Sequence, residues 1–131
     1  MPAYNFKARF VSGVETGRKP CTIRAKRKDG RRPRVGQTAY LYHGMRRAGC
    51  RLLRKAPIVL VQDIRIRAHG ATGVRIWLDG KAAGALEIIG LASLDGFDSP
   101  IHLRAFFEGE YGLPFRGDLI MWDTEKEKEV A

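Results

Sequence analysis

The eleven residues from Pro57 to Arg67 place the strongest constraint on the fold of this chain. They begin with the apolar run Ile58-Val59-Leu60-Val61 and continue as Ile64-Arg65-Ile66-Arg67, in which isoleucine alternates with arginine. Successive side chains of a β-strand point to opposite faces of a sheet, so this alternation buries the isoleucines and exposes the arginines. The pattern predicts a β-strand with one face against a hydrophobic core.

Other segments are typical of shorter strands. Apolar and polar side chains alternate from Gln37 to His43 and again over residues 74–78. The pair Asp79-Gly80 after the second segment favours a hairpin turn. Further extended segments are expected at residues 21–24 and 119–122, the last one after a turn at 116–118.

Apolar residues spaced four positions apart predict a helix near the start of the chain. Phe6, Phe10 and Val14 form one stripe on a helix from about Asn5 to Thr16, which Gly17 can end. Two more helices are expected, one within residues 82–93 and one that starts at Ser99-Pro100 and stops at Gly112.

The length and composition fit one ordinary core, because the chain has 131 residues of which 44% are hydrophobic. Five to six strands, mostly adjacent in sequence, with two or three helices indicate an α+β fold built on a small mixed β-barrel. We expect a single domain over residues 1–123 and a charged C-terminal tail over residues 124–131.

The positive charge is concentrated in one part of the chain. Residues 17–55 hold fourteen Lys and Arg against the single acid Asp29, within a total formal charge of +10. Such a block attracts a polyanion through phosphate contacts, which makes RNA the first partner to consider, DNA a possible one, and anionic lipid a weaker one. No obligate protein partner is predicted.

Membranes and export are not indicated by the sequence. No apolar run approaches the roughly 18 residues of a spanning helix, and the first 20 residues contain no hydrophobic signal core. Cys21 and Cys50 are too few for a disulfide framework or a four-ligand zinc site. We therefore expect a cytoplasmic protein.

The segment after the first helix is the best candidate for a pocket. If residues 22–24 are extended, Thr22 and Arg24 point to one face and Ile23 to the other, and Lys19 can fold over the first face. Two cations and a hydroxyl suit a phosphate or a carbonyl oxygen. The plainer interpretation is that Arg18, Lys19 and Arg24 are solvated charges near a helix end, where cations are favoured.

The charged stretch from Lys26 to Arg34 is expected to be an exposed loop that supplies attraction without specificity, because it has no aromatic residue on which a base could stack. Tyr40, Tyr42 and His43 could supply that stacking, although aromatic residues on a strand are more often part of the core. The glycine-flanked segment 44–51 could hold a phosphate. The residues expected to bind nucleic acid are Arg18, Lys19, Arg24, Lys26, Arg27, Arg31, Arg32, Arg34, Tyr42, Arg46, Arg47 and Arg51.

Metal and cofactor chemistry are not supported by any motif. His43, His69 and His102 are scattered without ligand spacing, and the chain has no P-loop and no dinucleotide fingerprint. No metal and no cofactor are predicted.

Several short motifs, in order along the chain, resemble a known family. Gly17-Arg18-Lys19, Thr22-Ile23-Arg24 and the segment 36–42 look like the signature of the ASCH domain, which has a PUA-like fold. The later blocks 95–99 and 112–115 are similar to those of short ASCH proteins of phages and prophages. The resemblance covers about residues 4–122.

This resemblance implies a small barrel with a cleft for RNA or a modified nucleoside. One branch of the family is a hydrolase that removes the acetyl group of N4-acetylcytidine, and Lys19 and Thr22 match two of its catalytic positions. Thr22 would be the nucleophile and Lys19 the base. Asp95, in place of the glutamate of the family, is the nearest match for the third role, and Glu87 is the fallback.

Three functions remain open from the sequence. The first is an RNA-binding or modified-nucleoside-binding protein with a basic cleft around Lys19, Thr22 and Arg24. The second is the N4-acetylcytidine amidohydrolase. The third is a ribonuclease, in which Lys19 and Arg24 would stabilise the charge on phosphorus, or a role in protein interaction.

Overall fold

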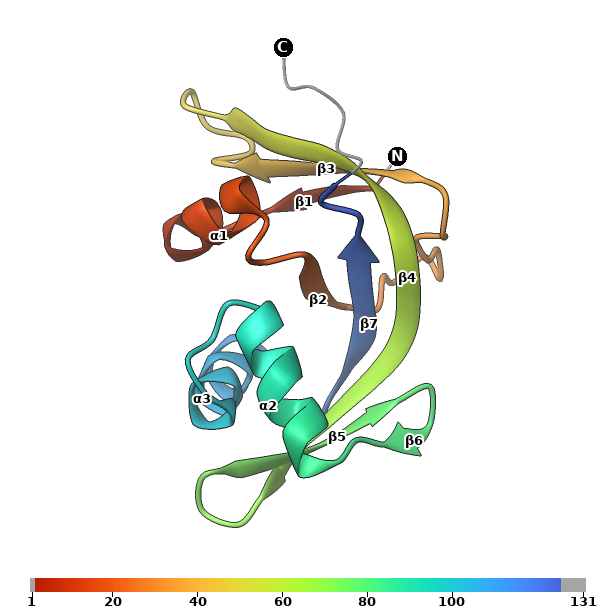
Figure 1. Cartoon of the computed structure of the whole chain (residues 1–131), viewed down its shortest axis with the longest axis vertical. Coiled ribbons are helices and arrows are strands. Elements are labelled where there is room, and N and C mark those ends of the chain that lie inside the picture. Colours follow the sequence, from red (N-terminus) through yellow and green to blue (C-terminus); the bar gives the residue numbers. More distant parts are fainter. Residues whose placement is uncertain (1, 126–131) are drawn as a thin grey trace.

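The computed structural model describes residues 2–125 and contains a seven-strand mixed sheet that curves around three α-helices (Figure 1). The strands are β1 (Ala3–Asn5), β2 (Cys21–Ala25), β3 (Thr38–His43), β4 (Arg51–His69), β5 (Gly73–Leu78), β6 (Lys81–Ala82) and β7 (Phe115–Trp122). The helices are α1 (Val11–Thr16), α2 (Ala85–Leu94) and α3 (Pro100–Glu110), and a short 3-10 helix, η1 (Ala8–Phe10), precedes α1.

Strand β4 organises the sheet because it pairs with three other strands. Its first half pairs with β3 and its last residues with β5, while β7 pairs along its middle on the opposite edge. At 19 residues it is longer than the expected range 57–67. The register shifts between Ile58 and Leu60, and an irregularity of this kind bends a strand. Because it bends, β4 pairs with β3 at one end of the curved sheet and with β5 at the other.

The expected small β-barrel is wrong, because the sheet is not closed. Among the described residues β1 pairs only with β3, and β2 only with β7. The three-residue β1 ends at Asn5, and the chain turns away into η1 instead of forming a ladder with β2. A side chain spans this gap, since Arg24 Nη2 donates to the Asn5 carbonyl at 2.8 Å.

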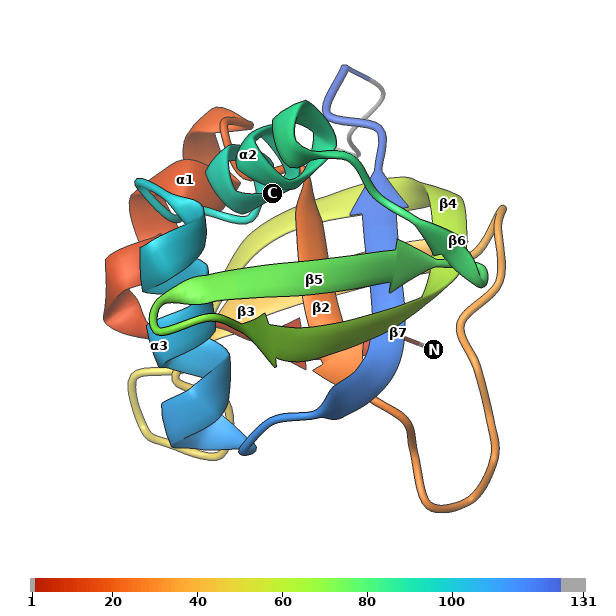
Figure 2. The ribbon, with the colours of Figure 1, turned by 90° about the horizontal axis from the view of Figure 1, so that it is seen from below.

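The helices lie within the concave side of the open sheet and complete the core (Figures 1 and 2). As predicted, Ile64 and Ile66 of β4 are fully buried, while Arg65 and Arg67 between and after them are exposed. Leu103 and Phe107 of α3 are buried in the same cluster. No helix within residues 2–125 has the length and apolar character needed to cross a membrane.

The first predicted helix is correct only in its second half. Residues 3–5 form β1, which pairs in parallel with β3, and regular α-helix begins at Val11. The apolar stripe is nevertheless buried, and Gly17 ends α1 with a left-handed φ of 83°. Apolar spacing thus identified the buried face, but the free edge of β3 offered residues 3–5 a better set of backbone partners than a helix. The other two helices, α2 and α3, are where the sequence predicted them.

The predicted turn at residues 116–118 is also wrong, because these residues belong to β7. Gly117 faces Ala25 of β2, and a Cβ added there would lie 2.1 Å from the Arg24 carbonyl oxygen. The glycine therefore permits a close approach of two strands. Of the expected C-terminal tail, residues 126–131 lie outside the described residues.

We expect Gly117→Ala to lower the free energy of unfolding by about 3 kcal/mol, because the methyl group would force β2 away from β7. Urea denaturation measures this loss. Gly109→Ala is the matched control, since Gly109 lies in α3 with open space around its Cα, and alanine there should stabilise by up to about 1 kcal/mol. Equal stability of Gly117→Ala and the wild type would contradict the close approach.

Candidate functional site

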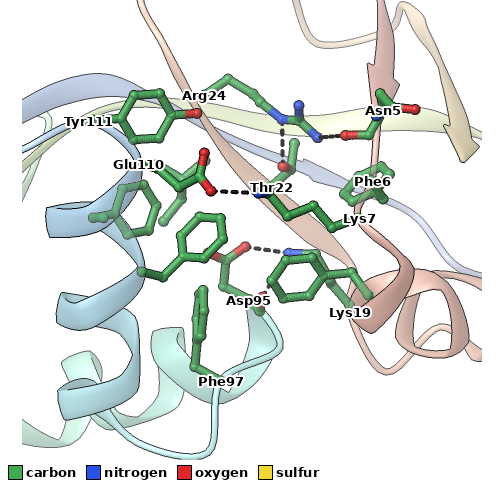
Figure 3. Close-up of a pocket in the computed structure, with 14 residues that line it drawn as sticks. Asn5, Phe6, Lys7, Lys19, Thr22, Arg24, Asp95, Phe97, Glu110 and Tyr111 are labelled. Atoms are coloured by element: carbon green, nitrogen blue, oxygen red, sulfur yellow. Dashed lines mark hydrogen bonds and ion pairs between the residues drawn. The ribbon is translucent and has the colours of Figure 1, made fainter. Parts of the chain in front are cut away.

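A cavity of about 250 Å³, here called the inner pocket, lies between the start of the chain, β2, and the helices α2 and α3 (Figure 3). Lys19, Thr22 and Asp95, three residues singled out from the sequence, all line it. The structure brings them together from the segment before β2, from β2 itself and from the end of α2. Its walls also include Arg24 and several aromatic rings.

Lys19 and Asp95 form a buried ion pair at the base of this pocket. Lys19 Nζ lies 2.6 Å from Asp95 Oδ1 and 2.7 Å from the Asp95 carbonyl oxygen, and each side chain is only 4% exposed. The Phe10 ring lies beside the ammonium, 4.8 Å from ring centroid to Nζ. Gly96 keeps this packing tight, because its φ is 94° and a Cβ there would lie 3.0 Å from Phe10.

Burial controls the proton equilibrium of this pair. It raises the pKa of the Asp95 carboxyl, and it does so more strongly than the neighbouring Lys19 ammonium lowers it. Cys21 Sγ lies 3.9 Å from Asp95 Oδ1, and burial together with that carboxyl raises the pKa of the Cys21 thiol. The Asp95 carboxyl is thus easier to protonate than an exposed carboxyl.

Thr22 and Arg24 point to the same face of β2, as the sequence predicted, and Ile23 is buried on the other. Arg24 Nε donates to Thr22 Oγ1 at 2.9 Å, so the hydroxyl oxygen is an acceptor and its proton is free for another partner. The guanidinium lies 4.9 Å from the Phe6 ring centroid and 5.3 Å from that of Tyr4. Burial lowers the pKa of Arg24.

The aromatic wall of the pocket was not recognised from the sequence. Phe10, Phe97 and Phe106 pack edge to face or tilted, with ring centroids 5.3 to 5.8 Å apart. Phe10 was expected only as a core residue, and Phe97 and Phe106 are distant in sequence from the basic residues of the segment 17–55. In the sequence, only the motif 95–99, which contains both Asp95 and Phe97, placed one of these two rings near a candidate site residue. At the rim, Lys7 Nζ contacts Glu110 Oε1 at 2.5 Å, and neither was predicted.

A second cavity of about 680 Å³, here called the arginine groove, lies beside the inner pocket and shares Arg24 with it. Residues 26–34 form an exposed loop, as predicted, and this loop makes one side of the groove. Ion pairs tie the loop to the sheet. Lys26 Nζ lies 2.6 Å from Asp118 Oδ1 and 3.0 Å from Asp63 Oδ1, and Arg32 Nη2 lies 2.8 Å from Asp118 Oδ1. The groove is lined by five arginines and one acid: Arg24, Arg27, Arg31, Arg32, Arg34 and Asp118.

The remaining candidate residues line neither cavity. Arg18 folds onto α1, where it donates to Thr16 Oγ1 and Ser12 Oγ, and Arg51 pairs with Glu15 at 2.7 Å. The fallback carboxylate, Glu87, accepts the Gly84 N–H at the start of α2. Tyr42 is half-buried on β3, and Arg46 and Arg47 are exposed on the β3–β4 turn. None of the three lines either cavity, although the turn contacts Asn5 of the inner pocket through the Met45 N–H.

Residues 2–125 contain no group of three or more His, Cys, Asp or Glu side chains able to hold a metal ion. None of the three histidines lines the inner pocket or the arginine groove. Comparisons with families of known proteins, with curated proteins and with solved structures find no match.

We expect Lys19→Met and Asp95→Leu each to lower the free energy of unfolding by roughly 3–5 kcal/mol, because each leaves an unpaired buried charge. The double variant should lose clearly less than the sum of the two losses, as measured by urea denaturation. Lys7→Ala, which breaks the exposed pair with Glu110, should cost only about 0–1 kcal/mol. Additive losses at Lys19 and Asp95 would show that the two groups do not interact.

Tyr4 on β1 should make stability depend on alkaline pH. Burial raises its pKa from 10.0 to about 12, although Arg24 opposes this shift. The fold therefore favours the neutral phenol, and this contribution is complete below pH 10 and is lost as the pH rises from 10 to about 12. The stability difference between wild type and Tyr4→Phe should change across that window, and a constant difference would contradict the assignment.

Proposed function

We propose that this chain binds RNA or a modified nucleoside by holding one base in the inner pocket. The observation that carries the proposal is the convergence of Lys19, Thr22, Asp95 and Arg24 on one cavity with aromatic walls. A volume of about 250 Å³ lies just below the roughly 300–1,000 Å³ typical of sites for drug-sized ligands. A single base or nucleoside is a ligand of suitable size.

The polar groups of the pocket suit the edge of a base. Thr22 Oγ1 and the guanidinium of Arg24 offer donors to carbonyl oxygens, and Glu110 at the rim offers an acceptor to an exocyclic amine. Aromatic rings and arginine planes are the surfaces on which proteins hold unstacked bases. We infer that the chain is an ASCH protein of the PUA-like superfamily, similar to short phage and prophage forms, and that its open sheet is a variant of their barrel.

That Lys19, Thr22 and Asp95 line one cavity supports a second candidate, hydrolysis of the acetyl amide of N4-acetylcytidine. Thr22 Oγ would attack the acetyl carbon and pass its proton to the Lys19 amine, while the C–N bond breaks and Asp95 gives its proton to the leaving amine. Water would then attack the acetyl-threonine ester and lose a proton to the Asp95 carboxylate, while Thr22 Oγ leaves with a proton from the Lys19 ammonium and acetic acid is released. This mechanism starts from the form of the pair with the proton on Asp95, whereas the structure pairs the Lys19 ammonium with the Asp95 carboxylate at 2.6 Å. Burial raises the pKa of Asp95, which lowers the cost of moving the proton to it.

Incubation with N4-acetylcytidine separates binding from catalysis. We expect the wild type to bind the nucleoside by calorimetry and to release cytidine and acetate by chromatography. Thr22→Val removes the nucleophile but keeps the shape of the side chain, so turnover should fall at least 100-fold. Lys19→Ala should abolish turnover as well.

The double variant Arg46→Ala/Arg47→Ala is the control, since it removes two exposed arginines that line neither cavity, and it should bind and turn over like the wild type. Unchanged turnover in Thr22→Val and Lys19→Ala would overturn the hydrolytic mechanism. A wild type that binds neither this nucleoside nor single-stranded RNA would overturn the proposed function itself.

A further inference from the structure

The inner pocket and the arginine groove meet at one side chain, Arg24. Its guanidinium lies between Phe6, which lines the inner pocket, and Tyr4, which lines the groove. Thr22 Oγ1 and the Asn5 carbonyl take two of its five N–H groups. The two cavities are therefore neighbours, and the Arg24 side chain forms part of the wall of both.

The groove remains positively charged after its internal ion pairs are counted. Asp118 is the single acid among its lining residues, is only 4% exposed, and is contacted by Lys26 and Arg32. Arg31 and Arg34 are exposed, and neither side chain makes an ion pair with any residue of the described range 2–125. Their charge is available to an anion.

The loop that carries these arginines has a defined shape, although it projects from the body of the molecule (Figure 2). The contacts of Lys26 and Arg32 with Asp118 tie it to β7 near its start and again further along. Asp29 Oδ1 accepts the Arg31 N–H at 3.0 Å, and Gln37 Oε1 accepts the Arg34 N–H at 2.8 Å. The loop is thus largely ordered before a ligand binds, so binding need not restrict its conformations much further.

We propose that the arginine groove is a binding site for the sugar-phosphate backbone, and that the ligand is a nucleotide within single-stranded RNA. This inference rests on the proposed function of the inner pocket. Guanidinium groups pair with phosphate oxygens, and a free nucleoside has no anion to place in the groove. A paired base could not enter a pocket that holds a single base, so the strand must be unpaired there.

The test compares a nine-nucleotide single-stranded RNA, carrying one central N4-acetylcytidine among uridines, with free N4-acetylcytidine. We expect the RNA to bind at least tenfold more tightly at low salt and to lose affinity steeply with salt. Arg31→Ala/Arg34→Ala should weaken RNA binding on the order of tenfold and reduce the salt slope by about 1.4, while affinity for the nucleoside stays unchanged. The Arg46→Ala/Arg47→Ala variant removes the same charge outside the groove and should have a much smaller effect.

Two outcomes would overturn this inference and leave the proposed pocket intact. They are RNA binding no tighter than nucleoside binding, and equal weakening of RNA binding by the two double variants. Binding to phosphatidylserine vesicles that needs Arg31 and Arg34, without RNA binding that needs them, would assign the groove to a membrane surface instead. Failure of both RNA and nucleoside to bind would instead refute the proposed function.

Discussion

The pairing of β4 along both of its edges is the constraint on which the candidate site depends. One edge holds β3, which holds β1, and the other holds β7, which holds β2. Because β4 bends, the outer strands of the two arms, β1 and β2, come close enough for Arg24 to reach the Asn5 carbonyl. The inner pocket lies beside the gap between β1 and β2, the two strands that did not pair. Thr22 and Arg24 come from β2, whereas Lys19 comes from the segment before it and Asp95 from the end of α2.

The ion pair at the base of this pocket is difficult to explain as a stabilising device alone. Taking two charges out of water costs several kcal/mol per ion, and well-packed apolar residues often serve equally well. Lys19 and Asp95 are each 4% exposed and sit among phenylalanine rings that could have filled the space. A buried carboxylate whose pKa is raised by burial, held against an ammonium, is better suited to moving a proton or meeting a polar ligand than to holding the fold.

The sequence predicted those features that depend on neighbours along the chain. Period-two alternation identified β3, β4 and β5, and the spacing in Thr22-Ile23-Arg24 placed the two polar side chains on one face. The sequence could not predict β1, because three residues are too few to show an alternation of apolar and polar side chains. Their conformation depends on the free edge of β3, with which they pair. Gly117 looked like a turn residue because the contact that requires a glycine there is with Arg24, which is 93 positions earlier in the chain.

The same limit applies to the charge of the basic block. Counted along the sequence, residues 17–55 are almost without acids, yet acids from elsewhere reach several of their cations: Asp95 contacts Lys19, and Asp118 contacts Lys26 and Arg32. The block is therefore less positive in space than in sequence. Arg31 and Arg34, which line the arginine groove, stay exposed and make no ion pair with any residue of the range 2–125. The surface that could attract a polyanion is therefore also positioned to orient one.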